Sequence, residues 1–363
     1  MPQGSVIGPL LFLMYIEDLG LPDTANNELN EKAATKILKF VDDSKLLKEI
    51  NSIEDVEHLQ DDLDVIYRWA DDNHMRWNAQ KFQMLRFGPG EVRFNTNIFA
   101  PHMEDVIESK EVVRDLGILI DDSMCYTSHI KKVISKVNNM TSWALRTFHG
   151  REIFLMKKIW KTIIQCHIDY GCILWYPLGR KGDMRALEDP LRAFTKRVKG
   201  LWNKSYHERL DIMKISSIER RVERYMLLYI WKSVNDYVPS IGLQWNQKTQ
   251  GRTGQTLLVE PIKGKVMSIK TLKANSMKQH GAVMFNSLPN ELKIFKGTVS
   301  QFKSKLDSFL SLFPDIPHMD SSHFGATTFE GDPSNSLVDW IRCLDVEWSL
   351  DAVKPQSQGV FVY

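Results

Sequence analysis

Hydrophobic positions follow two different repeats along this chain. In residues 36–48, Lys-Ile-Leu-Lys-Phe-Val-Asp-Asp-Ser-Lys-Leu-Leu-Lys, apolar residues lie on both sides of an acidic pair, Asp42-Asp43. This pattern predicts a strand, a tight acidic turn and a returning strand. Short apolar runs predict further strands at 83–87 and 92–97 and a hairpin at 112–121.

Apolar residues three and four positions apart predict helices elsewhere. One helix should run from Pro9 to about Asp18, and another over 52–74 should begin with a capping box formed by Ser52 and Asp55. From Ser128 onward the helical spacing dominates, which makes the chain an α+β protein. The later helices are expected at 127–148, 152–169, 182–199, 205–213 and 217–236.

The net charge of +2 over 363 residues conceals an asymmetry. Residues 1–125 carry 12 Lys and Arg against 24 Asp and Glu, whereas residues 126–232 carry 22 against 9. An acidic part beside a basic part suits a metal-and-phosphate site next to a nucleic-acid grip. The alternative is that the two surfaces attract each other within one protein.

The acidic pair is the first candidate for chemistry. Two adjacent carboxylates repel each other, and they lose solvation on partial burial unless a cation lies beside them. Oxygen ligands on a rigid turn suit Mg²⁺, which shares its remaining coordination with water and phosphates. An ordinary solvated turn is the alternative.

The cysteines and the apolar runs exclude other classes of protein. Cys125, Cys166, Cys172 and Cys343 form no CxxC pair, and the apolar surroundings of Cys166 and Cys172 favour buried thiols over metal ligands. The apolar run at 6–16 lacks the basic start and the cleavage site of a signal peptide, and no run is long enough to cross a bilayer. We therefore expect an intracellular protein, in the nucleus or cytoplasm, with no membrane partner.

The start of the chain adds a second motif. Residues 2–12 read Pro-Gln-Gly-Ser-Val-Ile-Gly-Pro-Leu-Leu-Phe, and Phe40-Val41-Asp42-Asp43 follows about thirty residues later. In this order, the two stretches resemble the reverse transcriptases of non-LTR retrotransposons of the jockey type, whose acidic hairpin usually has Ala where this chain has Val41. The resemblance implies an RNA-directed DNA polymerase, a nucleotidyltransferase that uses two Mg²⁺ ions. It also implies an RNA template, a DNA primer and deoxynucleoside triphosphates as partners.

The resemblance assigns roles to individual residues. Asp42 and Asp43 would hold Mg²⁺, and Lys81, three residues after Asn78, would assist the departing pyrophosphate. Phe82 departs from the Cys or Thr of the family, and a plain Lys at a strand start is the alternative for Lys81. The expected template and nucleotide pocket contains Gln3, Gly4, Ser5, Phe40 and Val41, and the expected primer grip contains Leu116, Gly117 and Ile118.

The later chain continues the resemblance to about residue 317. Leu187 to Leu201 is similar to a family helix of Arg, Thr and Lys that ends at a Gly-Leu pair, and it would grip a duplex through Arg192, Lys196, Arg197 and Lys199. A solvated basic helix face is the alternative. The expected domains are a partial palm (1–125), a helical thumb (126–240), a mixed C-terminal region (241–317) and a poorly ordered tail (318–363).

The family has fingers and a further catalytic Asp upstream of the Pro-Gln-Gly loop. This sequence has Met1 at that point, so we expect a truncated copy, a partial gene model or a remnant that is inactive by itself. Two alternatives remain: a non-catalytic nucleic-acid-binding remnant that depends on residues 126–232, and a silent fragment with no function.

Overall fold

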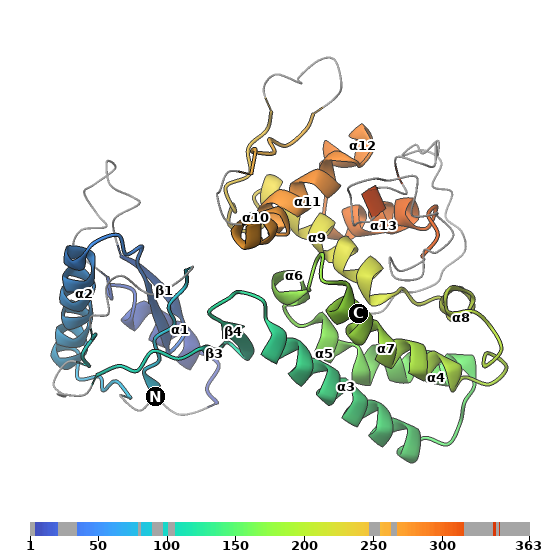
Figure 1. Ribbon diagram of the computed structural model, residues 1–363, viewed down its shortest axis with the longest axis horizontal. Helices are drawn as coiled ribbons and strands as arrows, with labels where there is room; N and C mark the ends of the chain where they lie inside the picture. Colours follow the sequence, from blue (N-terminus) through green and yellow to red (C-terminus); the bar gives the residue numbers. More distant parts are fainter. Residues whose placement is uncertain are drawn as a thin grey trace. The chain divides into compact units, whose positions relative to one another are not determined.

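The computed structural model describes residues 4–20, 35–78, 81–88, 97–100, 106–246, 255–262, 267–315, 337–338 and 341. The fold is mixed α and β, with two small antiparallel sheets of two strands each (Figure 1). The chain divides into two compact units, Met1–Arg114 with Asp121–Ser123, and Asp115–Ile120 with Met124–Tyr363. Over the described ranges, no helix has the length and apolar character needed to cross a membrane.

The first unit is built around helix α2. This helix begins with the predicted capping box, because the Ser52 side chain accepts from the Asp55 backbone and the Asp55 side chain accepts from the Ser52 backbone. Its apolar stripe includes Leu63 and Ile66 and packs against the acidic hairpin and the segments that follow. The elements of this unit are α1 (Gly8–Tyr15), β1 (Lys36–Phe40), β2 (Asp43–Leu47) and α2 (Ile53–Asp72).

Two predicted strands of this unit have different outcomes. The strand at 83–87 is wrong, because the structure has only an isolated bridge between Met84 and Ser109 there. Phe82 and Met84 instead cover the apolar side of α2, where the Phe82 ring stacks on Tyr67 at 5.7 Å. Nearly all of the strand expected at 92–97 lies outside the described residues.

The second unit is mainly helical (Figure 1). The hairpin of β3 and β4 has residues in both units. A π-helical turn at Trp160–Ile164 continues α4 into α5, where the sequence predicts one uninterrupted helix. The elements are β3 (Val112–Asp115), β4 (Ile118–Asp121), α3 (Thr127–Thr147), α4 (Ile153–Ile159), α5 (Cys166–Asp169), α6 (Cys172–Trp175), α7 (Lys181–Lys196), α8 (Tyr206–Met213), α9 (Ile218–Val234), α10 (Met267–Ala274), α11 (Met277–Asn286), α12 (Asn290–Lys293) and α13 (Val299–Leu310).

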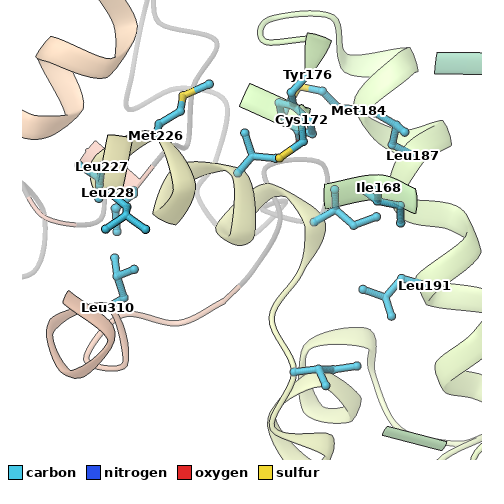
Figure 2. Close-up of a cluster of buried hydrophobic side chains, with 14 of the residues drawn as sticks. Ile168, Cys172, Tyr176, Met184, Leu187, Leu191, Met226, Leu227, Leu228 and Leu310 are labelled. Carbon is cyan, nitrogen blue, oxygen red and sulfur yellow. The ribbon is translucent and has the colours of Figure 1, made fainter. Parts of the chain in front are cut away.

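One hydrophobic core runs through the second unit from Ile118 to Val338. Figure 2 shows part of it, with apolar side chains from α5, α6, α7, α9 and α13 gathered around α9. The Trp231 ring stacks on Phe302 at 4.3 Å, which packs α9 against α13. The segments expected as a thumb and a C-terminal region therefore share one core, and their boundary at 240 stays a prediction. In the segment expected as a tail, Leu337 and Val338 are buried in this core.

The two cysteines that were expected to be buried differ in exposure. Cys172 is buried, and burial raises the pKa of its thiol to about 12. For Cys166 the prediction is wrong, because this side chain is exposed while its neighbours Ile164 and Ile168 point into the core. The described residues contain no group of three or more His, Cys, Asp or Glu that could hold a metal ion.

Candidate active site and nucleic-acid interface

The acidic hairpin places its two carboxylates at a strained turn. Phe40 pairs with Asp43 across the strands, so Val41 and Asp42 form a two-residue turn. Val41 has φ of +54°, a conformation that is uncommon for a β-branched residue. Both carboxylates are exposed, and within the described structure neither accepts a side-chain hydrogen bond. Strain and exposed acid therefore lie at the same point, as is common at functional turns.

A lysine that sequence analysis did not select fixes this hairpin to α1. The Lys39 ammonium donates hydrogen bonds to the carbonyl oxygens of Ile16, Glu17 and Leu19, at 2.9, 2.9 and 3.0 Å. These carbonyls follow the end of α1, where backbone acceptors lack helical partners. Lys39 shares one face of β1 with Ile37, which packs toward Leu19. A lysine two positions from a core residue in a strand was the available signal.

The structure describes two of the three residues that the loop before α1 would contribute to the template and nucleotide pocket. Gly4 has φ of +88°, which only glycine adopts readily. The Ser5 hydroxyl accepts a hydrogen bond from the Gly8 amide at 3.0 Å and so supports the start of α1. Gln3 lies outside the described residues.

The donor set of the hairpin fits a Mg²⁺ ion. Asp42 and Asp43 supply hard oxygen ligands, and Mg²⁺ is commonly held by one or two carboxylates with water and phosphate completing its octahedron. Lys81 is exposed, and its backbone amide donates a hydrogen bond to the Asn78 carbonyl oxygen at 2.9 Å. In the part of the chain that the structure describes, no hydrogen bond or ion pair joins Lys81 to Asp42 or Asp43.

The turn between β3 and β4 is held by the second unit. Leu116 and Gly117 have φ of +43° and +89°, and glycine adopts such a conformation readily. The Tyr170 hydroxyl donates to the Leu116 carbonyl oxygen at 2.7 Å, and a Cβ added at Gly117 would lie 3.6 Å from the Tyr170 ring. Residues 116–118 are thus positioned by an aromatic residue that carried no functional signal in the sequence.

His129 holds the strand that follows this turn. Its Nδ1 accepts a hydrogen bond from the Leu119 amide at 3.2 Å, and its ring packs edge-on against Trp175 at 5.1 Å. Burial, with a smaller effect from the charge of Lys132, lowers the pKa of His129. The neutral ring is the form that accepts this bond, so burial and hydrogen bonding favour the same state.

The four cations predicted to grip a duplex have two different roles. Lys196, Arg197 and Lys199 are exposed at the end of α7. Arg192 is half-buried, and its guanidinium lies 4.2 Å from the centre of the Tyr206 ring. Arg192 therefore packs α7 against α8, while the other three cations face solvent.

A buried carboxylate lies beneath this surface. Glu188 accepts hydrogen bonds from the Tyr206 hydroxyl and from the Ile218 amide at the start of α9. Burial raises the pKa of Glu188 to about 7 despite these donors. The geometry therefore assigns Glu188 a structural role that joins α7, α8 and α9.

Comparison with known proteins points to mobile elements. The chain is 28% identical over 181 residues to the RNA-directed DNA polymerase from mobile element jockey of Drosophila melanogaster, covering 47% of this chain and 18% of that protein. It is 23% identical over 184 residues to the probable RNA-directed DNA polymerase from transposon X-element of the same species, covering 48% and 19%. An uncharacterised protein of Caenorhabditis elegans is 29% identical over 112 residues, covering 30% and 56%.

The matched segment is thus about a fifth of the length of the two polymerases. The predicted resemblance to reverse transcriptases of non-LTR retrotransposons is confirmed by these similarities. No protein-family model matches the chain, and no solved structure matches it.

Proposed function

We propose that this chain is part of an RNA-directed DNA polymerase of a non-LTR retrotransposon. The observation that carries the proposal is the exposed Asp42-Asp43 pair on a strained hairpin tied to α1, in a chain similar to two such polymerases. In this proposal the first unit contributes part of the palm. The helical second unit contributes the thumb and the region after it.

Each site residue then has a task in nucleotidyl transfer. Asp42 and Asp43 would hold Mg²⁺, which supplies charge neutralisation at the nucleotide phosphates. Gln3, Gly4, Ser5, Phe40 and Val41 would border the template and the incoming nucleotide, and the Lys81 ammonium would neutralise the leaving pyrophosphate. Leu116, Gly117 and Ile118, supported by Tyr170, would hold the primer end.

A chimeric polymerase tests this proposal. Residues 1–317 would replace the corresponding part of the jockey polymerase, with primer extension measured on an RNA template in Mg²⁺. We expect extension that is lost in Asp42→Asn. The matched control is Asp122→Asn, which removes an exposed carboxylate at the end of the second hairpin. Extension that survives Asp42→Asn, or a folded chimera without activity, would contradict the proposal.

A second candidate, nucleic-acid binding without catalysis, is supported by a different observation. Residues 126–232 carry a net charge of +13, and Lys196, Arg197 and Lys199 lie together on the surface. In this case a hybrid duplex would bind to the chain whether or not Asp42 and Asp43 are present. Binding unchanged by Asp42→Asn, together with an inactive chimera, would favour this candidate over the first.

A further inference from the structure

Two large aromatic side chains of the second unit lie almost fully in solvent. Trp202 is 75% exposed and Phe154 is 77% exposed. The same unit buries Trp160, Trp175 and Trp231 completely. These are the two most exposed aromatic side chains that the structure describes in this unit, which makes them candidates for contact with a ligand.

Backbone structure brings the two aromatic segments together. Trp202 follows α7 in a turn that needs Gly200, which has φ of +80°. Leu201, next to Trp202, is 4% exposed and anchors the turn in the core. The Lys199 amide donates to the Arg151 carbonyl oxygen at 2.8 Å, which ties this turn to the segment that leads into α4 and Phe154.

The surroundings of Trp202 are cationic. Residues 196–204 contain no acidic side chain, and their four cations are all exposed; they are Lys196, Arg197, Lys199 and Lys204. Arg151 does not add to this surface, because its guanidinium binds carbonyl oxygens at the end of α3. Glu152 is an exposed acid beside Phe154.

We propose that Trp202 stacks on an unpaired base of a single-stranded nucleic acid whose phosphates contact Lys196, Arg197 and Lys199. The inference rests on the proposed function, which makes nucleic acid the ligand. A duplex hides its base faces within the stack, whereas a single strand offers them to aromatic side chains. Lysine is depleted at protein interfaces, so an aromatic residue among lysines suits nucleic acid better than a protein partner.

Binding by the full chain tests this inference. Fluorescence anisotropy would compare labelled single-stranded oligo(dT) and oligo(U) with a blunt RNA–DNA hybrid of equal length. We expect Trp202→Ala to weaken single-strand binding between about 5-fold and about 100-fold, with little change for the hybrid. Trp202→Phe keeps a ring and should retain most of the affinity, whereas Trp202→Leu keeps apolar bulk and should behave like Ala.

Four outcomes would overturn the inference. Equal single-strand affinity of the Leu and Phe variants would show that apolar bulk, and not base stacking, is recognised. Stronger binding to phosphatidylserine vesicles than to either oligonucleotide would assign the surface to a membrane. Hybrid binding by the wild type, together with single-strand binding that Trp202→Ala leaves unchanged, would refute stacking and leave the proposed function intact. Binding to no nucleic acid at all would refute both.

Discussion

At the scale of single residues, Val41 stores strain beside the acidic pair. Of the two turn residues, only Val41, at the first position, has positive φ, and hairpins favour glycine at such a position. We expect Val41→Gly to raise the free energy of unfolding of the first unit by about 1 kcal/mol, because relief of strain outweighs the added freedom of the unfolded chain. Denaturant titration would measure this change.

The matched control is Val106→Gly. Val106 has the same exposure, 41%, but lies outside the positive φ region. It has no strain to release, so glycine should lower the stability there. Equal effects of the two substitutions would show that the conformation of Val41 carries no strain.

Glu188 should make stability depend on pH. Its pKa is about 7 in the folded chain and ordinarily 4.5, so the folded state binds more protons between these values. The stabilisation is therefore complete below about pH 4.5 and is lost as the pH rises through 7. We expect the free energy of unfolding to fall by up to about 3 kcal/mol over this window. The fall should flatten in Glu188→Gln and persist in Glu260→Gln, an exposed control.

At the scale of elements, how well the sequence predicts the structure depends on the kind of pattern that marks each element. Helices α2, α3, α7, α8 and α9 were predictable because their core positions repeat at helical spacing. The π-helical turn at Trp160–Ile164 was not predictable, because the pattern of side chains does not show where the backbone hydrogen bonds change to the longer spacing of a π-helix. The strand expected at 83–87 failed because Phe82 and Met84 are used to cover α2.

The turn after β3 should loosen when Tyr170 loses its hydroxyl. Tyr170→Phe removes the hydrogen bond to the Leu116 carbonyl, a change of roughly 1 kcal/mol in local stability. We expect faster amide hydrogen exchange around 116–118. Tyr237→Phe is the control, since its similarly exposed hydroxyl donates to the distant Gly297 carbonyl. Unchanged exchange at 116–118 would mean that the turn is stable without the hydrogen bond from Tyr170.

The end of α7 should control the salt dependence of hybrid binding. Replacing Lys196, Arg197 and Lys199 by Ala removes up to three phosphate contacts. The plot of log affinity against log salt should therefore become shallower by about one unit of slope per lost contact. Arg192→Ala should leave the slope unchanged and lower the stability, because Arg192 packs on Tyr206. A slope in the triple variant equal to that of the wild type would show that these side chains are only solvated and contact no phosphate.

At the scale of the whole molecule, the sequence marks local motifs but not the residues that support them. The acidic pair and the glycine turns were visible because special residues mark them. Lys39, Tyr170 and His129 were not, since each acts through a backbone group distant in sequence. Arg192 looked like its basic neighbours until Tyr206 was found beneath it.

Residues 1–363 by themselves should bind Mg²⁺ weakly and extend no primer. Two-metal transfer needs ligands on both sides of the metal pair, and in the described ranges the acidic hairpin supplies only two carboxylates. Calorimetry should show no tight stoichiometric Mg²⁺ binding. Primer extension that disappears in Asp42→Ala would show that these residues are active by themselves. Tight Mg²⁺ binding that survives Asp42→Asn with Asp43→Asn would place the metal ligands elsewhere.

The buried charges of α9 impose an order on folding during synthesis. Arg220 and Glu223 pair at 3.1 Å with side chains 9% exposed. Arg220 also donates to the Leu310 and Pro314 carbonyls, and Glu223 accepts from the Leu337 amide. A nascent chain that has just finished α9 therefore has this ion pair but lacks its further partners, which lie about ninety and more than a hundred residues later. Because burying these groups without their full set of partners is costly, we expect the second unit to close its core only after residue 337 has been made.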